Sequence, residues 1–389
     1  MDLARARYLV SGRGKAALAS LPASLAELPL NSLAATLRRD FASVEAAALG
    51  EQVTLRARAA ERHGADRGLL FTAEGLEMMT HPAVAQRRAA RLAALGLPVI
   101  DLTCGIGGDL FACAEAGSSA FGLERDPATA LLAAANVPRA AVVRGDALRA
   151  PFDLAKAMVF IDPSRRAGGS RRFDPRAFSP PWDAAVSLLE GAAGGVLKAP
   201  PGIDHHHFPP GSEVEWVQLG RSLREAAVWM GQGAEPGVRR AVWLPSGTEI
   251  DSGCEEAEAA PSVPRAFIFD PESCVTNAGL VRHLAFRLGA SLMDTKVAYL
   301  TADAPAEDPL AVAFEVLEVV PFSLARLKER LRARGLKADE IRRRAFPVEP
   351  DELRRLLGPM DGEPVTLLCT TIAGKRTVFI ARRVKPNIA

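Results

Sequence analysis

The fold is decided by one stretch of the chain, Val99-Ile100-Asp101-Leu102-Thr103-Cys104-Gly105-Ile106-Gly107-Gly108-Asp109. Its first residues are β-branched and apolar and predict a strand, and its glycines predict a tight turn. The next residues, Leu110 to Ala114, predict the start of a helix. At such a junction the free backbone N–H groups and the positive end of the helix dipole meet a ligand. Gly105 and Gly107 carry no Cβ, so they permit the sharp turn and let a ligand lie against the backbone.

The residues around this turn separate two classes of ligand. A dinucleotide fingerprint would have a third glycine at the position of Leu110. Asp101 stands at the strand end instead, and a carboxylate there suits a ligand with a cationic amino group better than a pyrophosphate. The pattern D-x-x-x-G-x-G resembles motif I of class I methyltransferases, which bind S-adenosylmethionine. An ordinary glycine-rich strand–helix turn is the alternative, and a dehydrogenase is the least favoured function.

Length and composition indicate a globular protein of more than one domain. The chain has 389 residues, of which 48% are hydrophobic and 24% charged, enough for a sizeable core. Its net charge of +2 means that any basic surface must be local. The five cysteines form no C-x-x-C pair, and the sequence shows neither a signal-peptide core nor an apolar run of about 18 residues. We expect a cytoplasmic protein without a membrane span.

Hydrophobic periodicity predicts the order of the domains. Helical leucine spacing predicts an N-terminal helical subdomain over residues 1–68. Strands alternate with helices over 69–248, as a parallel sheet requires, and a polar, acidic linker follows over 249–262. A second α/β domain is predicted over 263–389.

The elements of these domains can be predicted in more detail. In the first sheet we expect strands at 98–102, 119–124, 140–143, 157–161, 194–198, 213–219, 226–230 and 240–244, ending in a hairpin-like pair. In the second domain we expect strands at 265–270, 297–301, 313–320, 365–371 and 376–382, and helices at 277–288, 323–334, 339–344 and 349–357. The strands at 365–371 and 376–382 are expected to form a terminal hairpin.

Four acids follow successive strands of the first sheet: Asp101, Glu124, Asp146 and Asp162. An open parallel sheet binds its ligand outside the carboxyl ends of its strands, so these side chains are expected to converge. Glu124 follows Gly105 by 19 residues, near the offset of about 20 at which a carboxylate meets ribose hydroxyls. Asp146 is suited to accept a hydrogen bond from an adenine amino group. Together the four acids predict a nucleoside site.

Further motifs extend the resemblance. The run Phe71-x-x-Glu74-Gly75 through Thr80-x-Pro82-x-Val84-Ala85 is similar to RNA cap methyltransferases of the trimethylguanosine-synthase type. With Ile161-Asp162-Pro163-Ser164-Arg165-Arg166 and the second domain, residues 69–389 resemble a bacterial methyltransferase family that carries a THUMP-like C-terminal domain. This resemblance implies a Rossmann-like, seven-stranded α/β core after the helical subdomain, with a C-terminal α/β THUMP-like domain. THUMP domains are associated with structured RNA, tRNA above all, so the resemblance also implies an RNA substrate.

The loop after the fourth strand departs from the family pattern. Amino-directed nucleic-acid methyltransferases usually have two prolines and an aromatic residue there, whereas this chain has Ser164 and Arg165 at the last two of these positions. Arginine can stack on a base or hold a phosphate through two hydrogen bonds. The methylated atom is therefore left open.

These motifs lead to a hypothesis for each site residue. For the cofactor S-adenosylmethionine, we expect Asp101 to hold the amino group, Gly105 and Gly107 to form the floor, Glu124 to bind ribose and Asp146 to bind adenine. Thr80 is a further candidate for the cofactor site and the predicted N-cap of a helix whose first turn contains Pro82. For catalysis we expect Asp162 to face the attacking group, and Arg165 and Arg166 to hold the substrate. Lys198, at the next strand end, is a candidate to join them, with a solvated strand-end lysine as the alternative. A structural salt bridge between Asp162 and the arginines is the alternative.

Two further runs of basic residues are candidate sites. Consecutive histidines at 205–207 do not present one face, so a loop is favoured over a metal site. From residue 321 onward there are 16 Lys or Arg against 8 Asp or Glu, a candidate phosphate-binding surface around Arg326, Arg330, Arg334 and the run 342–344. A solvated helix face is the alternative. A non-catalytic RNA-binding protein, and a methyltransferase of proteins or small molecules, are the rival functions.

Overall fold

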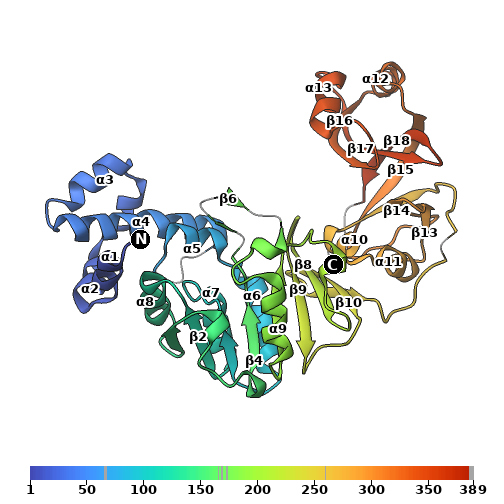
Figure 1. Ribbon diagram of the computed structural model, residues 1–389. Helices are drawn as coiled ribbons and strands as arrows, with labels where there is room; N and C mark the ends of the chain where they lie inside the picture. Colours follow the sequence, from blue (N-terminus) through green and yellow to red (C-terminus); the bar gives the residue numbers. More distant parts are fainter. Residues whose placement is uncertain (65–67, 165, 168–169, 172–173, 259, 385–389) are drawn as a thin grey trace. The chain divides into compact units, whose positions relative to one another are not determined.

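Strands alternate with helices between residues 99 and 199 (Figure 1). These strands form the centre of the first sheet. The computed structural model describes residues 1–64, 68–164, 166–167, 170–171, 174–258 and 260–384. The chain divides into two units, Met1–Glu213 with Ala226–Gly237, and Val214–Glu225 with Val238–Ala389. In the described part of the chain, no helix is both long and apolar enough to span a membrane.

The N-terminal residues form a group of helices, as predicted. The group contains α1 (Leu3–Val10), α2 (Gly12–Ser20), α3 (Leu30–Leu37) and α4 (Ser43–His63). Polar caps define their ends: the Asp2 side chain accepts a hydrogen bond from the Arg5 N–H at the start of α1. Buried leucines of these helices share a core with Leu132 of α8 (Pro127–Asn136), so the helices pack directly against the first unit's α/β layer (Figure 1).

The first sheet contains the strands predicted for the Rossmann-like core. The order β8-β9-β7-β4-β1-β2-β3 is parallel from β7 to β3, and β9 runs antiparallel to β7. The bounds are β1 Val99–Asp101, β2 Ala120–Glu124, β3 Ala141–Arg144, β4 Met158–Ile161, β7 Gly194–Ala199, β8 Glu213–Leu219 and β9 Ser222–Gly231. The Rossmann-like, seven-stranded α/β core is therefore confirmed.

Two strands extend this sheet beyond the seven. In the second unit, β10 (Arg239–Leu244) pairs in parallel with β8, and β11 (Thr248–Asp251) pairs with β10. The expected pairing of 226–230 with 240–244 is wrong, because β8 lies between β9 and β10. Residues 249–251 of β11 fall in the expected linker, but the Arg240 side chain pairs with Glu249 and Asp251, and Ile250 is buried.

Helices cover the parallel sheet and contribute its core. They are α5 (Ala73–Met78), α6 (Pro82–Ala93), α7 (Gly108–Glu115), α8 and α9 (Trp182–Glu190). Leu92 of α6 and Leu110 of α7 are fully buried with Phe160 of β4. Pro82 is in the first turn of α6 as predicted, but the cap is His81, whose Nδ1 accepts a hydrogen bond from the Ala83 N–H. Thr80 is not the N-cap, because its hydroxyl is engaged elsewhere, as described below.

The second unit contains a seven-stranded sheet of order β13-β14-β12-β15-β18-β17-β16. Its pairs are antiparallel except for β16 with β17, which are parallel. The bounds are β12 Phe267–Pro271, β13 Ser291–Asp294, β14 Val297–Ala302, β15 Ala311–Pro321, β16 Leu336–Arg344, β17 Glu363–Ile372 and β18 Lys375–Arg383. Helices α12 (Leu324–Ala333) and α13 (Pro350–Leu357) pack on this sheet through Leu327, Leu331 and Leu353. The terminal hairpin and both helices agree with the predictions.

Two predictions for this unit are wrong. Residues 339–344 lie in strand β16 and not in a helix, because Arg342 and Arg344 both reach Asp270 from the same face of the strand. The helix expected over 277–288 is two helices, α10 (Ser273–Ala278) and α11 (Val281–Arg287). Gly279, with φ of +69°, ends α10 and separates them.

Candidate functional site

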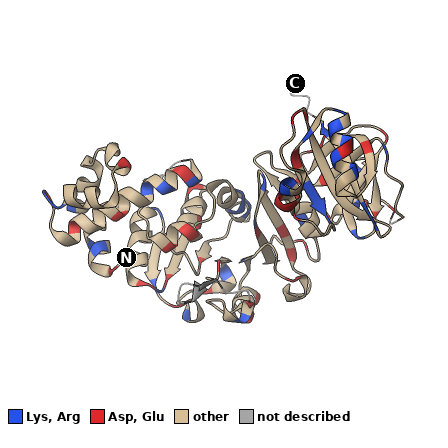
Figure 2. Cartoon of the chain, turned by 90° about the horizontal axis from the view of Figure 1, so that it is seen from above, with Lys and Arg blue, Asp and Glu red and all other residues tan. Residues whose placement is uncertain are grey.

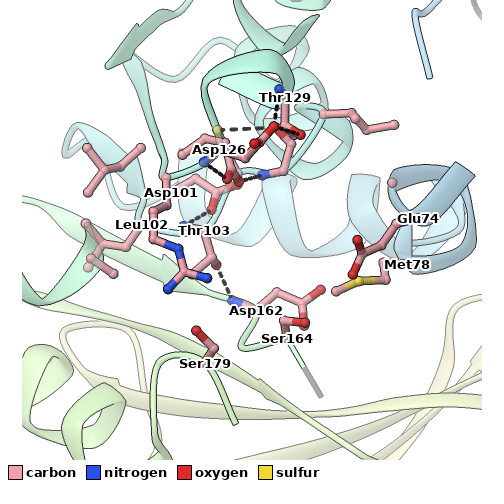
Figure 3. A pocket seen from close by; sticks show the side chains of 18 of the residues that line it. Glu74, Met78, Asp101, Leu102, Thr103, Asp126, Thr129, Asp162, Ser164 and Ser179 are labelled. Atoms are coloured by element: carbon pink, nitrogen blue, oxygen red, sulfur yellow. Dashed lines mark hydrogen bonds between the residues drawn. The ribbon is translucent and has the colours of Figure 1, made fainter. Parts of the chain in front are cut away.

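The carboxyl ends of β1, β2 and β4 open into a cavity of about 870 Å³ (Figure 3). That volume is in the range of pockets that bind small molecules, about 300–1,000 Å³. Five of the predicted site residues line it: Asp101, Gly105, Glu124, Asp146 and Asp162. The expected convergence of the four acids on one site is therefore observed.

The glycine turn between β1 and α7 supports one side of this cavity. Gly105 has φ of +54°, and a Cβ on it would meet no atom within 4 Å, so glycine is needed there for its backbone conformation. Gly107 has φ of +90°, and a Cβ on it would lie 2.8 Å from Val137 Cγ2. Gly107 thus lets the turn approach α8 and does not line the cavity, in contrast to the expected floor of two glycines.

Asp101 has a carboxylate that is only half satisfied. The residue is 1% exposed, and its Oδ1 accepts a hydrogen bond from the Thr103 N–H at 3.0 Å. Its Oδ2 is buried and has no hydrogen-bond partner among the described residues. Burial, followed by the charge of Asp109, raises the pKa of Asp101 well above its ordinary value. A buried carboxylate oxygen in this state is suited to a cationic donor from a ligand.

Glu124 ties the second strand end to the glycine turn. Its Oε2 accepts a hydrogen bond from the Gly105 N–H at 3.1 Å, and its Oε1 accepts one from the Asp126 N–H at 2.7 Å. Burial raises the pKa of Glu124. Each carboxylate oxygen has a second lone pair, so Glu124 is held in position while still able to accept hydrogen bonds from ligand hydroxyls.

Asp146 occupies the third strand end. It is exposed, lines the cavity, and caps the 3₁₀ turn Ala147–Arg149 by accepting a hydrogen bond from the Leu148 N–H at 2.9 Å. That bond holds the Asp146 carboxylate in position just after the end of β3.

Asp162 begins the loop after β4 and is held at two points. Its N–H donates to Thr103 Oγ1 at 2.7 Å, which joins the ends of β4 and β1. Its Oδ2 accepts a hydrogen bond from Lys198 Nζ at 2.6 Å, with side-chain exposures of 23% for Asp162 and 16% for Lys198. Lys198 therefore joins Asp162 as the sequence predicted. The pair is partly buried, so the ion pair fixes the direction of the carboxylate.

Thr80 extends this contact into a chain of polar groups. Lys198 Nζ donates to Thr80 Oγ1 at 2.8 Å, and the Thr80 hydroxyl donates to Asp109 Oδ2 at 2.8 Å. Asp109, at the start of α7, also pairs with the buried Arg88. Although both are described, neither Thr80 nor Lys198 lines the cavity. Thr80 thus links Asp109 and, through Lys198, Asp162, two residues that do line the cavity.

The structure adds residues that sequence reasoning left unassigned. Figure 3 shows Glu74 and Met78 of α5 beside Asp162 and Ser164 at the cavity. The motif Phe71-x-x-Glu74-Gly75 was the available signal for this segment. Ser164 is joined to Ser179 by two backbone hydrogen bonds of 2.8 and 2.9 Å, which bring a distant loop to the cavity.

The structure does not test the roles predicted for Arg165 and Arg166. Arg165 lies outside the described residues. Arg166 opens the short strand β5 (Arg166–Ala167), which pairs with β6 (Ser170–Arg171). The roles of both arginines stay predictions.

The histidine run forms the 3₁₀ turn His205–His207, where His206 Nδ1 lies 2.7 Å from Asp204 Oδ1. Within the described ranges, no three His, Cys, Asp or Glu residues are grouped so that they could hold a metal ion.

Basic and acidic residues both occur along the second unit (Figure 2). Many of the basic residues are paired with acids. Arg330 and Arg334 pair with Glu318, whereas Arg343 pairs with Glu349. Asp270 holds Arg342 and Arg344, as noted above. All three arginines of the run 342–344, together with Arg330 and Arg334, therefore form ion pairs within this unit.

Comparisons with known proteins assign the chain to a family. Residues 311–383 match the family model described as THUMP domain-like. The chain is 35% identical over 328 residues to two proteins of Mycobacterium tuberculosis, Rv3037c of strain H37Rv and MT3122 of strain CDC 1551. The alignment covers 82% of this chain and 89% of each relative, and both are described as uncharacterized S-adenosylmethionine-dependent methyltransferases. The chain belongs to this family of S-adenosylmethionine-dependent methyltransferases.

A solved structure supports the fold of this methyltransferase over its whole length. A candidate methyltransferase from Porphyromonas gingivalis W83 superposes with a TM-score of 0.74 at 21% identity, and 98% of each chain is covered. This likeness confirms the predicted fold. The predicted methyltransferase activity and its cofactor are confirmed by the two mycobacterial relatives, and the THUMP-like domain by the family model over 311–383.

The residues at the cavity fit S-adenosylmethionine. The unpartnered Asp101 Oδ2 suits the cofactor's cationic amino group, and Glu124 and Asp146 offer acceptors for hydroxyl and amino groups. The open space at Gly105 lets a ligand lie against the backbone.

Proposed function

We propose that this methyltransferase methylates a nucleotide of a structured RNA, tRNA or rRNA. The observation that carries the proposal is the presence, on one chain, of a methyltransferase cavity and a THUMP domain-like segment at 311–383. THUMP domains are associated with structured RNA, and the chain from residue 321 onward has twice as many basic as acidic residues.

The cofactor side of the cavity is assigned to the acids at the first three strand ends. S-adenosylmethionine supplies a methyl group already activated on a sulfonium. Asp101 Oδ2 accepts a hydrogen bond from the cofactor's amino group, Glu124 from its ribose hydroxyls and Asp146 from its adenine amino group. The two backbone N–H bonds to Glu124 keep its carboxylate in place when no ligand is bound.

The substrate side is assigned to the loop that Asp162 begins. Because the donor is activated, the protein mainly has to align the attacking atom with the methyl group. Asp162 orients the attacking group and accepts its proton as the new bond to carbon forms. Lys198 holds the Asp162 carboxylate at 2.6 Å, and Arg165 and Arg166 are proposed to hold the RNA.

Mass spectrometry of modified nucleosides tests the RNA substrate. Total RNA is compared between a wild-type strain, a strain lacking the gene, and the deletion strain complemented with wild type or Asp162→Ala. We expect one methylated nucleoside to disappear on deletion and to return with wild type but not with Asp162→Ala. Asp153→Asn, a change at an exposed acid outside the cavity, is the matched control and should restore it. An unchanged nucleoside profile on deletion would contradict the proposal.

A further inference from the structure

A second cavity, of about 550 Å³, lies in the THUMP domain-like segment. It forms where the carboxyl ends of β16 and β17 meet the start of β18, since Arg344 is paired with Thr370 and Thr371 with Arg376. Arg343 and Arg376 line it, and none of its described lining residues is acidic. The charged side chains that line the cavity are therefore basic, although Arg343 is itself paired with Glu349.

The two arginines are available to a ligand in different ways. Arg343 lies on the opposite face of β16 from the arginines that reach Asp270. It donates to the Phe346 carbonyl at 2.8 Å and pairs with Glu349, which fixes a guanidinium that still has further N–H groups. Arg376 is exposed and forms no ion pair with any residue that the structure describes.

The backbone around this cavity has an uncommon conformation. Ala345 and Ala373, with φ of +49° and +46°, are the non-glycine residues with positive φ in the described part of the chain. Ala345 lines the cavity, and Ala373 precedes Gly374, which also lines it. Both are held by specific bonds: Thr371 Oγ1 donates to the Ala345 carbonyl at 2.7 Å, and the Ala373 N–H donates to Asp294 Oδ2 at 2.9 Å. Ala373 and Gly374 form the two-residue turn between β17 and β18, where positive φ is ordinary. Ala345 follows the end of β16, and a non-glycine residue with positive φ is the kind of conformation that concentrates at binding sites.

We propose that this cavity binds a phosphodiester group of the RNA, with Arg376 and Arg343 donating to its oxygens. This inference rests on the proposed RNA substrate. It places a second contact with the RNA far along the sequence from the loop that Asp162 begins. Planar guanidinium groups match the geometry of phosphate oxygens, and two of them beside an acid-free cavity select for an anion. The volume leaves room for the sugar attached to the phosphate.

Binding of fluorescein-labelled bulk tRNA to the full chain, followed by anisotropy at several KCl concentrations, tests this site. The variants are Arg376→Ala and, as a matched control, Arg355→Ala, at an exposed arginine of α13 that has no ion pair with a described residue. We expect Arg376→Ala to lower the affinity about tenfold. The slope of log affinity against log salt should become shallower by about 0.7–0.9. Arg355→Ala should change neither quantity, and titration with S-adenosylmethionine should be the same for all three proteins.

The other outcomes separate the two proposals. If wild type binds tRNA and Arg376→Ala binds it equally well, or if both variants lose affinity equally, the cavity does not hold the phosphate and the proposed function stands. If wild type binds S-adenosylmethionine but neither bulk tRNA nor bulk rRNA, the RNA function fails and this inference fails with it. If calorimetry shows inorganic phosphate binding as tightly as tRNA, the cavity is a small-anion site and the RNA contact is wrong.

Discussion

Replacement of Asp101 by asparagine tests the cofactor assignment most sharply, because it changes one charge and almost no volume. The retained Oδ1 can still accept the hydrogen bond from the Thr103 N–H, so the local fold should persist. What is lost is the negative charge at Oδ2, the buried oxygen that has no partner among the described residues. A hydrogen bond to a charged group contributes about 1.5–3 kcal/mol. We therefore expect the Kd for S-adenosylmethionine to rise about 10- to 100-fold, measured by isothermal titration calorimetry.

The same variant has a pH signature that a merely structural role would not produce. Burial raises the pKa of Asp101, so the folded protein without cofactor keeps this proton to a higher pH than the unfolded chain does. Between the unfolded and the folded pKa the folded state binds more protons, and its free energy of unfolding falls as pH rises. The ionised carboxylate favours the cationic cofactor, so cofactor affinity should rise with pH across the folded pKa, with release of a proton.

In Asp101→Asn both pH dependences should be reduced, and the cofactor-free variant should be at least as stable as wild type at neutral pH. Calorimetry in buffers of different ionisation enthalpy measures the released proton, and thermal unfolding measures the stability. An Asp101→Asn protein that binds S-adenosylmethionine as tightly as wild type, with the same proton release, would refute the assignment.

Three further changes give distinct outcomes. Lys198→Met should slow methyl transfer to bulk RNA by at least about tenfold, with Lys198→Arg recovering part of the rate. The affinity for S-adenosylmethionine should stay within about twofold, and an equal loss in both assays would contradict a positioning role. Gly107→Ala should lower the free energy of unfolding by about 2 kcal/mol, because φ is +90° and the new Cβ would lie 2.8 Å from Val137; chemical denaturation measures it. Asp270→Ala should cost about 3 kcal/mol in thermal unfolding, since it removes the acid paired with Arg344 and one of the two acids paired with Arg342. An unchanged midpoint would contradict the importance of this cluster.

Most strands and helices of the first domain could be predicted from the sequence, because the two kinds of element differ in the spacing of their hydrophobic residues. The errors lie where distant residues decide the local structure. Residues 339–344 have a helical composition, yet Arg342 and Arg344 are drawn into a strand by Asp270, about 70 residues earlier. The acidic start of the expected linker becomes β11 because Arg240 pairs with its acids.

The site residues that stand at the ends of strands could be predicted from the sequence. Asp101, Glu124, Asp146 and Asp162 could be found because parallel strands bring their carboxyl ends together. The chain of contacts through Thr80 could not, since the Asp109 and Lys198 that it joins are 89 residues apart in the sequence and no spacing rule links them. Glu74 and Met78 likewise reach the cavity only through the packing of α5.

Transfer of a tritiated methyl group from S-adenosylmethionine to bulk RNA tests the central claim most directly. The RNA is taken from a strain lacking the gene, so that the target nucleotide is unmethylated. We predict radioactivity that is incorporated by wild type, removed by ribonuclease but not by protease, and abolished by Asp162→Ala. Incorporation into protein, or none into RNA while S-adenosylmethionine binds normally, would contradict the claim.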